Sequence, residues 1–105
     1  MADTLTRLEA TIASRKGADP ASSYVASLFA KGRPKIARKL GEEAVETIVA
    51  ALAEDKAALT GEAADTIFHL LILLAEADVP FADVLAELER RENMSGHDEK
   101  AARAG

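Results

Sequence analysis

Four acidic residues occur as two similarly spaced pairs near the middle of the chain: Glu43 with Glu46, and Glu62 with Asp65. Residues three or four apart share one face of an α-helix, so the members of each pair would point the same way. Glu46 lies eight residues before Glu54, and Glu62 lies eight residues after it. Glu43 and Asp65 lie eleven residues to either side of the same point. Two antiparallel helices joined at Glu54 would therefore bring all four carboxylates to one level.

Carboxylates held between two helices about 8–10 Å apart repel one another unless they face water or enclose a cation. Their oxygens are hard ligands of the kind that Mg²⁺ prefers. A solvated helix face explains any single acidic pair, but two pairs mirrored about a turn and flanked by small residues favour a metal site. Neither helix carries the Glu-x-x-His of di-iron bundles, and a zinc site would need cysteine or paired histidine. We therefore predict a magnesium site with the ligands Glu43, Glu46, Glu62 and Asp65.

Five basic residues precede the acidic cluster: Lys31, Arg33, Lys35, Arg38 and Lys39. Taken alone, this run is equally compatible with a solvated basic face that includes a Lys39–Glu43 ion pair worth about 0.3–0.5 kcal/mol. Beside a magnesium site it favours a phosphate clamp. The predicted substrate-binding residues are Lys31, Lys35 and Lys39.

His69 lies one turn after Asp65 on the same stripe of the predicted helix. In such a position a histidine is more often a hydrogen-bonded interior residue than a metal ligand. The chain contains no glycine-rich phosphate loop, no Ser/His/Asp set and no Rossmann fingerprint.

The spacing of apolar residues predicts helices over residues 5–12, 24–29, 34–52, 56–74 and 81–91. Ser22 or Ser23 is expected to cap the second helix, and Pro34 fits the first turn of the third. A break at residues 53–55 would separate the third and fourth helices, with Asp55 as the cap of the fourth. Residues 1–93 are predicted to form one all-α domain, and residues 94–105 a polar tail.

Two apolar patterns predict how these helices associate. On the third helix the expected core stripe consists of Ile36, Leu40, Ala44, Ile48, Ala51 and Leu52. Residues 67–74 are apolar on nearly every side except at His69. A helix of this kind must be buried all round, and in so short a chain that indicates a second subunit. The predicted fold is an all-α antiparallel bundle of about five helices, completed by dimerisation.

Composition restricts the classes of function. With 105 residues, 49% of them apolar and only three Phe and one Tyr, the chain suits one small helical domain better than a sheet. A net charge of −5 argues against non-specific binding to nucleic acid or to an anionic membrane. The absence of cysteine excludes thiol chemistry. The N-terminus lacks a signal-like apolar core, and the longest apolar run is far below the roughly 20 residues that span a bilayer. These features predict a soluble, cytoplasmic protein.

The E-x-x-E of Glu43 and Glu46, followed by the E-x-x-D of Glu62 and Asp65, resembles the signature of the all-α nucleotide pyrophosphatases (MazG-like). A longer match through SYVASLFAKGRPKIARKLGEEAVETIVAAL, GEAADTIFHLLILL, DVLAELERRE and SGHDEKAARA resembles the phosphoribosyl-ATP pyrophosphatase family. The resemblance implies magnesium-dependent hydrolysis of N1-(5-phosphoribosyl)-ATP to phosphoribosyl-AMP and pyrophosphate, in histidine biosynthesis. It also implies the same four ligands, and leaves Glu42 or Glu46 to activate the water.

Two alternatives remain open at this point. A house-cleaning pyrophosphatase for noncanonical nucleoside triphosphates would use the same four acidic residues with a different base-and-sugar pocket. A helical dimerisation module without enzymatic activity would need only the apolar stripes, and would not bind magnesium at the acidic cluster.

Overall fold

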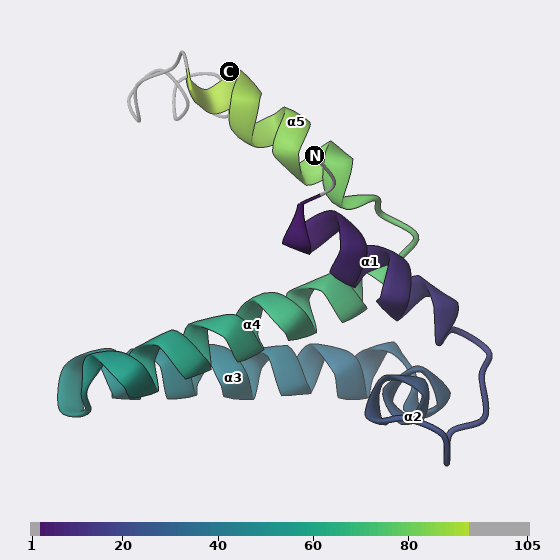
Figure 1. Cartoon of the computed structure of the whole chain (residues 1–105), viewed down its shortest axis with the longest axis horizontal. Helices are drawn as coiled ribbons and strands as arrows, with labels where there is room; N and C mark the ends of the chain where they lie inside the picture. The colour runs from purple at the N-terminus through teal and green to yellow at the C-terminus, as the bar shows by residue number, and fades with distance from the viewer. Residues whose placement is uncertain (1–2, 93–105) are drawn as a thin grey trace.

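The computed structural model describes residues 3–92, which form five helices and no strand. The helices are α1 (Thr4–Ser14), α2 (Tyr24–Lys31), α3 (Arg33–Ala53), α4 (Lys56–Glu76) and α5 (Phe81–Glu92) (Figure 1). The predicted all-α class is confirmed. The predicted tail, residues 94–105, lies outside the described residues.

The centre of the fold is the antiparallel pair of α3 and α4, each 21 residues long, which lie side by side in Figure 1. Pro34 lies in the first turn of α3, where a missing N–H costs no helical hydrogen bond. The pair is joined by a break of two residues, and the Asp55 carboxylate accepts a hydrogen bond from the Ala58 N–H at 2.8 Å. The predicted hairpin and its cap are confirmed.

The two N-terminal helices cover one end of this pair. The Ser23 hydroxyl caps α2 by accepting from the Ala26 N–H at 3.0 Å, which decides between the two predicted serines. Between α2 and α3, Gly32 has φ +93°, a backbone conformation that favours glycine and lets α3 turn away at once. The core that results contains the fully buried side chains of Ile12, Leu28, Ile36, Leu71 and Ile72.

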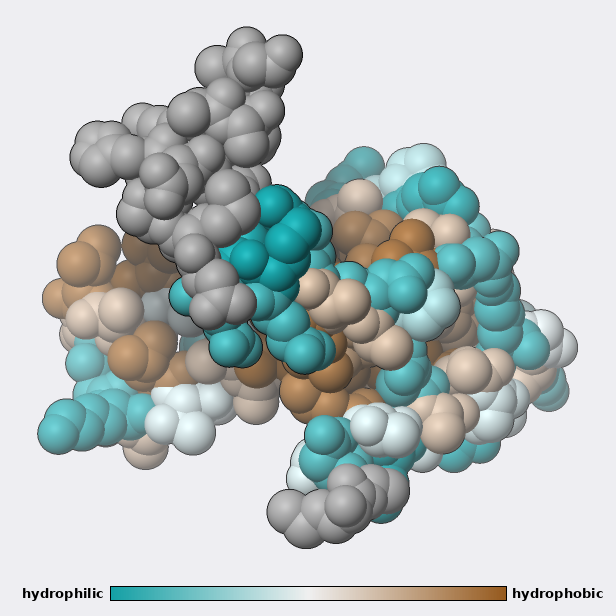
Figure 2. Space-filling view, turned by 90° about the horizontal axis from the view of Figure 1, so that it is seen from above, coloured by the Kyte–Doolittle hydropathy of each residue, from teal (hydrophilic) through white to brown (hydrophobic). Residues whose placement is uncertain are grey.

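The predicted core stripe of α3 is wrong in its C-terminal half. Ile36 is buried, but Ile48 is 58% exposed and Leu52 is 83% exposed. The buried residue in this half is Ala50, because here α3 contacts α4 through the neighbouring face. Hydrophobic residues consequently reach the surface over the α3–α4 pair (Figure 2, left).

Residues 67–74 are covered by their own chain to a greater extent than the sequence pattern indicates. Leu71 and Ile72 are buried, and within this segment only Ile67 is a strongly exposed apolar residue. The opposite holds for α5, which projects away from the α3–α4 pair and has no buried residue (Figure 1). Its apolar residues Leu85 and Leu88 are 42% and 53% exposed.

By length and composition, α4 is the one helix within residues 3–92 that could span a membrane. The core helix of a soluble protein passes the same test. Here α4 carries three polar residues, Glu62, Asp65 and His69, that contact or face side chains of α2 and α3. These contacts pack α4 against α2 and α3, and a single helix of this kind is weak evidence of a membrane span.

Candidate metal centre

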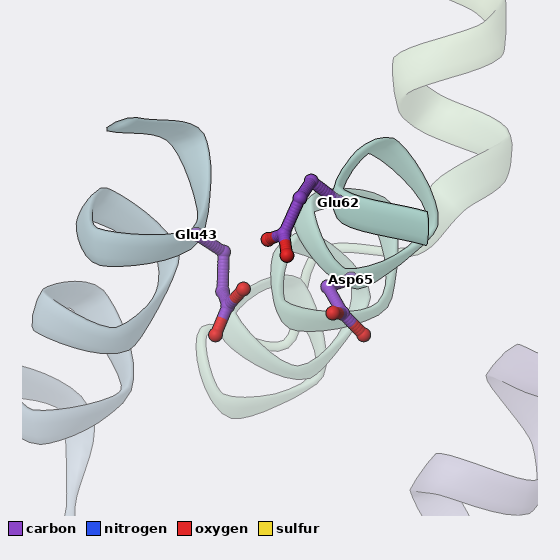
Figure 3. Close-up of side chains that lie close together, drawn as sticks. All are labelled: Glu43, Glu62 and Asp65. Carbon is purple, nitrogen blue, oxygen red and sulfur yellow. The ribbon is translucent and has the colours of Figure 1, made fainter. Parts of the chain in front are cut away.

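Three of the four predicted acidic residues converge between α3 and α4. Glu43 extends from α3, and Glu62 and Asp65 extend from successive turns of α4 (Figure 3). Each offers one carboxylate oxygen, and the three oxygens lie within 4.8 Å of one another. The hairpin register expected from the sequence therefore brings residues from opposite arms of the pair to one point.

Two of these carboxylates, those of Glu43 and Glu62, are held where a negative charge is poorly solvated, whereas Asp65 is exposed. The Glu62 Oε2 atom is buried and has no hydrogen-bond partner, and the Glu43 side chain is only 12% exposed. Burial, followed by contact with Glu46, raises the pKa of the Glu43 carboxyl above its usual value. Burial and the nearby charge of Glu46 likewise raise the pKa of Glu62. A cation between the helices would relieve both the repulsion and the missing contact.

Glu46 and Glu42 lie beside the three converging carboxylates rather than among them. Glu46 affects the pKa of both Glu43 and Glu62, so its carboxylate lies beside the cluster, although the residue is exposed. Glu42 is also exposed, and its carboxylate lies 3.6 Å from the Lys39 ammonium. Both lie at the edge of a shallow hollow on α3 that Arg38, Gly41 and Val45 also line.

A pair of threonines connects the two helices one turn beyond the acidic residues. The Thr47 and Thr66 hydroxyls lie 2.8 Å apart across the interface. Each also lies within hydrogen-bond distance of a carbonyl in its own helix: Glu43 O at 2.9 Å from Thr47, and Glu62 O at 3.0 Å from Thr66. Two hydroxyl protons must serve three contacts, so at any moment one of the three contacts has no proton. The contact fixes the spacing of α3 and α4 next to two of the predicted ligands.

The predicted basic residues differ in how closely they approach this cluster. Lys39 is nearest, with its ammonium 3.6 Å from Glu42 and 3.9 Å from Glu43. Lys35 lies one turn earlier on α3 and is half-buried, whereas Lys31 is exposed at the end of α2. Arg33 is directed elsewhere, toward the Glu76 carboxylate and carbonyl. The structure thus places one of the three proposed phosphate-binding lysines directly beside the carboxylates.

Sequence reasoning treated Tyr24 only as an apolar residue of the second helix and missed its place at this site. Its hydroxyl lies 2.8 Å from Nε2 of His69, whose Nδ1 lies 2.7 Å from the backbone carbonyl of Asp65. His69 is buried and hydrogen-bonded, which confirms its predicted interior role. No sequence signal links Tyr24 to His69, because the contact spans 45 residues and depends on how α2 packs.

The donor set fits a small hard cation. Ligands on opposite sides of a Mg²⁺ ion lie about 4.2 Å apart, because each bond is about 2.1 Å long. The three oxygens, all within 4.8 Å, would need only small side-chain adjustments to reach that spacing. Mg²⁺ usually keeps several waters and shares its remaining positions with substrate phosphates, which suits a site with few protein ligands and an open side.

Comparison with known proteins agrees with a nucleotide-hydrolysing site. A family model described as "Phosphoribosyl-ATP pyrophosphohydrolase" matches residues 5–92. A "Phosphoribosyl-ATP pyrophosphatase" from Rhizorhabdus wittichii is 70% identical over 103 residues, covering 98% of this chain and 97% of the relative. A relative of the same name from Novosphingobium aromaticivorans is 63% identical, over 97% of this chain and 95% of the relative. Another, from Dinoroseobacter shibae, is 64% identical, over 94% of this chain and 97% of the relative.

Proposed function

The chain belongs to the phosphoribosyl-ATP pyrophosphohydrolase family, and on that premise we propose that its carboxylate cluster binds Mg²⁺ and hydrolyses the α–β phosphoanhydride of phosphoribosyl-ATP. The products are phosphoribosyl-AMP and pyrophosphate. The protein acts in the cytoplasm, in histidine biosynthesis. One observation carries the assignment of the site: the Glu62 carboxylate, whose Oε2 is buried without a hydrogen-bond partner, has an oxygen within 4.8 Å of carboxylate oxygens from Glu43 and Asp65.

In this mechanism the protein's own residues bind the metal and the substrate and orient the phosphates. Glu43, Glu62 and Asp65 hold the metal, with Glu46 as a fourth ligand or an outer neighbour. When bound, Mg²⁺ neutralises charge on the phosphate oxygens and on the leaving pyrophosphate. Lys39, with Lys35 and Lys31 further out, binds phosphate oxygens on the open side of the cluster. Phosphoryl-type transfer depends mainly on such positioning and charge stabilisation.

Glu46 is the better placed of the two residues proposed to activate water. Its carboxylate borders both Glu43 and Glu62 without belonging to the closest three, so it could accept a proton from a water held beside the metal. Glu42 is instead engaged with Lys39 at 3.6 Å. Glu46→Gln is therefore expected to reduce kcat more than Glu42→Gln does.

Pyrophosphate release measured on a substrate panel tests the function. Phosphoribosyl-ATP should be hydrolysed with a kcat/KM far above that of ordinary or modified nucleoside triphosphates, and only with Mg²⁺ or Mn²⁺ present. Preference for a modified triphosphate would favour the house-cleaning alternative. Failure to bind Mg²⁺, measured by calorimetry, would favour the dimerisation module.

The threonine contact should set metal affinity. Thr47→Val and Thr66→Val each remove a hydroxyl from the bridge beside two ligands, and outer-shell changes of this kind typically cost about tenfold or more in metal affinity. We expect calorimetry to show about tenfold weaker Mg²⁺ binding. Thr60→Val is the matched control, because Thr60 makes the same bond to a carbonyl four residues earlier, on the exposed side of α4. An equal loss in Thr60→Val would show that the effect is not local.

We also propose that the chain is a homodimer. Val45, Ile48, Val49 and Leu52 recur at the spacing of one helix face and are 47% to 83% exposed, which is unusual for four adjacent apolar side chains. This stripe on α3, rather than residues 67–74, is the proposed centre of the interface. A second copy related by twofold symmetry would bury the same stripe on both chains.

Sedimentation at micromolar concentration tests the dimer. Wild-type protein should sediment as a dimer, and the double substitution Ile48→Glu with Leu52→Glu should shift it to monomer, because two charges per chain would be buried at the interface. Ala57→Glu adds one such charge near the start of α4, outside the stripe, and should remain dimeric. A wild-type protein that is a uniform monomer would refute the proposal.

A further inference from the structure

Gly41 lies in the interior of α3, where neither the backbone conformation nor the packing of the chain requires a glycine. Its φ angle lies outside the left-handed region, in contrast to that of Gly32. A Cβ built on Gly41 would meet no atom of residues 3–92 within 4 Å beyond the adjacent backbone of its own helix. Glycine is the most destabilising residue in a helix interior after proline, because it loses the most backbone freedom on folding. The bare backbone at this point is therefore not explained by the stability of the helix.

The missing side chain leaves space for a wide, open hollow on the surface of α3. The hollow has a volume of about 800 Å³, within the range of about 300–1,000 Å³ that is usual for small-molecule sites. Its surface is mostly apolar: Gly41 and Val45 contribute bare backbone and an aliphatic side chain, while Glu42 and Glu46 contribute carboxylates. A planar ring can lie against the apolar part while the carboxylate oxygens accept hydrogen bonds from N–H or O–H groups at its edge.

The hollow adjoins the carboxylate cluster. Glu42, which lines the hollow, lies 3.6 Å from the Lys39 ammonium, and that ammonium lies 3.9 Å from Glu43. Glu46, which also lines the hollow, follows Glu43 by three residues and so shares its side of α3. A ligand whose phosphates are held at the cluster therefore has the hollow within reach, past Glu42 and Glu46.

We propose that the hollow on α3 binds the adenine ring and adjoining ribose of phosphoribosyl-ATP, and that Gly41 is a specificity-determining residue that keeps the helix surface open to them. The inference rests on the proposed function, because the metal and the phosphates bring the nucleoside to this place. The adenine ring is planar with apolar faces, and Glu42 and Glu46 can accept hydrogen bonds from its nitrogen substituent and from the ribose hydroxyls. A side chain at position 41 would occupy the volume that the ring needs.

Val45 connects the hollow to the surface proposed for the dimer. It lines the hollow and also begins the exposed apolar stripe of α3, so the hollow lies at one end of the proposed interface. A glycine on a helix surface can also admit a second copy of the chain at close range. A side chain at position 41 would obstruct either occupant, so kinetics and oligomeric state must be measured on the same variants.

Gly41→Ala and Gly41→Leu test the subsite as a graded series, with steady-state kinetics on phosphoribosyl-ATP and magnesium pyrophosphate binding measured by calorimetry. Both variants should raise the Tm by several degrees, because each places a strong helix former in open space. The KM should nevertheless rise, by about tenfold for alanine, as expected for an overpacked contact, and further for leucine, while kcat changes by less than about twofold. Binding of magnesium pyrophosphate, which has no nucleoside, should be unchanged.

Gly61→Ala is the matched control. Gly61 is an interior glycine of α4 at which an added Cβ would also meet nothing within 4 Å, and it is not among the residues that line the hollow. This variant should raise the Tm in the same way and keep the KM of wild type. Arg38→Met keeps an unbranched apolar side chain in the wall of the hollow, so it should not raise the KM appreciably either.

The possible outcomes separate this inference from the proposed function. An unchanged KM in both Gly41 variants, or an equal rise in Gly61→Ala, would overturn the nucleoside subsite and leave the metal site standing. A shift of the Gly41 variants to monomer in sedimentation would also overturn it, since the glycine would then serve to admit the second copy. If Glu62→Gln binds magnesium pyrophosphate as wild type does, the metal site fails and the subsite fails with it.

Discussion

Glu62→Gln is expected to lower kcat/KM for phosphoribosyl-ATP by at least about a thousandfold, because a metal ion supplies several kcal/mol of transition-state stabilisation and each 1.36 kcal/mol is tenfold. Within residues 3–92, Glu62 has the one side-chain oxygen that is buried without a hydrogen-bond partner, and a bound cation would supply the missing contact. The amide keeps the shape of the side chain but removes its charge. Glu43→Gln, Glu46→Gln and Asp65→Asn should also abolish turnover while the helical circular dichroism is retained.

Steady-state pyrophosphate release at saturating magnesium measures this loss. Glu54→Gln is the control, since Glu54 is an exposed glutamate at the hairpin and lies outside the cluster. Near-normal activity in any two of the four variants would refute the ligand assignment.

The same substitution should stabilise the metal-free protein. Folding raises the pKa of Glu62, chiefly by burial and then by the charge of Glu46, so the native state binds protons more tightly than the unfolded state. The free energy of unfolding therefore falls as the pH rises from the ordinary glutamate pKa through the raised one. With a chelator present to remove metal ions, Glu62→Gln should flatten this part of the dependence of unfolding free energy on pH, and it should raise the Tm at pH 7. Added Mg²⁺ should raise the Tm of wild type but not of the variant.

Much of this arrangement follows from local sequence, since caps and periodicity act within a few residues. Asp55 caps α4 through an N–H three residues away, and Pro34 lies in the first turn of α3, so the length of both helices and the hairpin register could be predicted. The register in turn brings Glu43, Glu62 and Asp65 together. The assignment of metal and roles to these residues stays a prediction, because a carboxylate spacing does not identify its cation.

Features that depend on contacts distant in sequence could not be predicted in this way. Hydrophobic periodicity shows that Ile48 and Leu52 share an apolar stripe, but not whether their own chain or another molecule covers it. The link from Tyr24 to His69 requires α2 to lie against α4. The threonine bridge requires two hydroxyls to meet across the hairpin, and threonines one turn beyond each ligand carry no signature of their own.

Lys39→Met is expected to lower kcat/KM by about a hundredfold, the usual cost of removing one donor to developing charge, and to lower kcat with it. Its ammonium lies 3.6 Å from the Glu42 carboxylate and 3.9 Å from that of Glu43, beside the proposed metal ligands. Negative charge on the leaving pyrophosphate grows along the reaction. The ammonium therefore stabilises the transition state more than the bound substrate.

Lys35 and Arg38 provide graded comparisons on the same helix. Lys35 lies one turn before Lys39 and should contact the substrate without following the charge that develops, so Lys35→Met should mainly raise KM. Arg38 is rotated by about 100° from Lys39 and lines the outer hollow of α3 with Gly41 and Val45, so Arg38→Met should have the smallest effect. Steady-state pyrophosphate release by the three variants at saturating magnesium measures this order. The predicted order of the effects on kcat/KM follows from which residue faces the carboxylates. If Arg38→Met lowers kcat/KM the most, or if all three variants match wild type, Lys39 does not bind the phosphates.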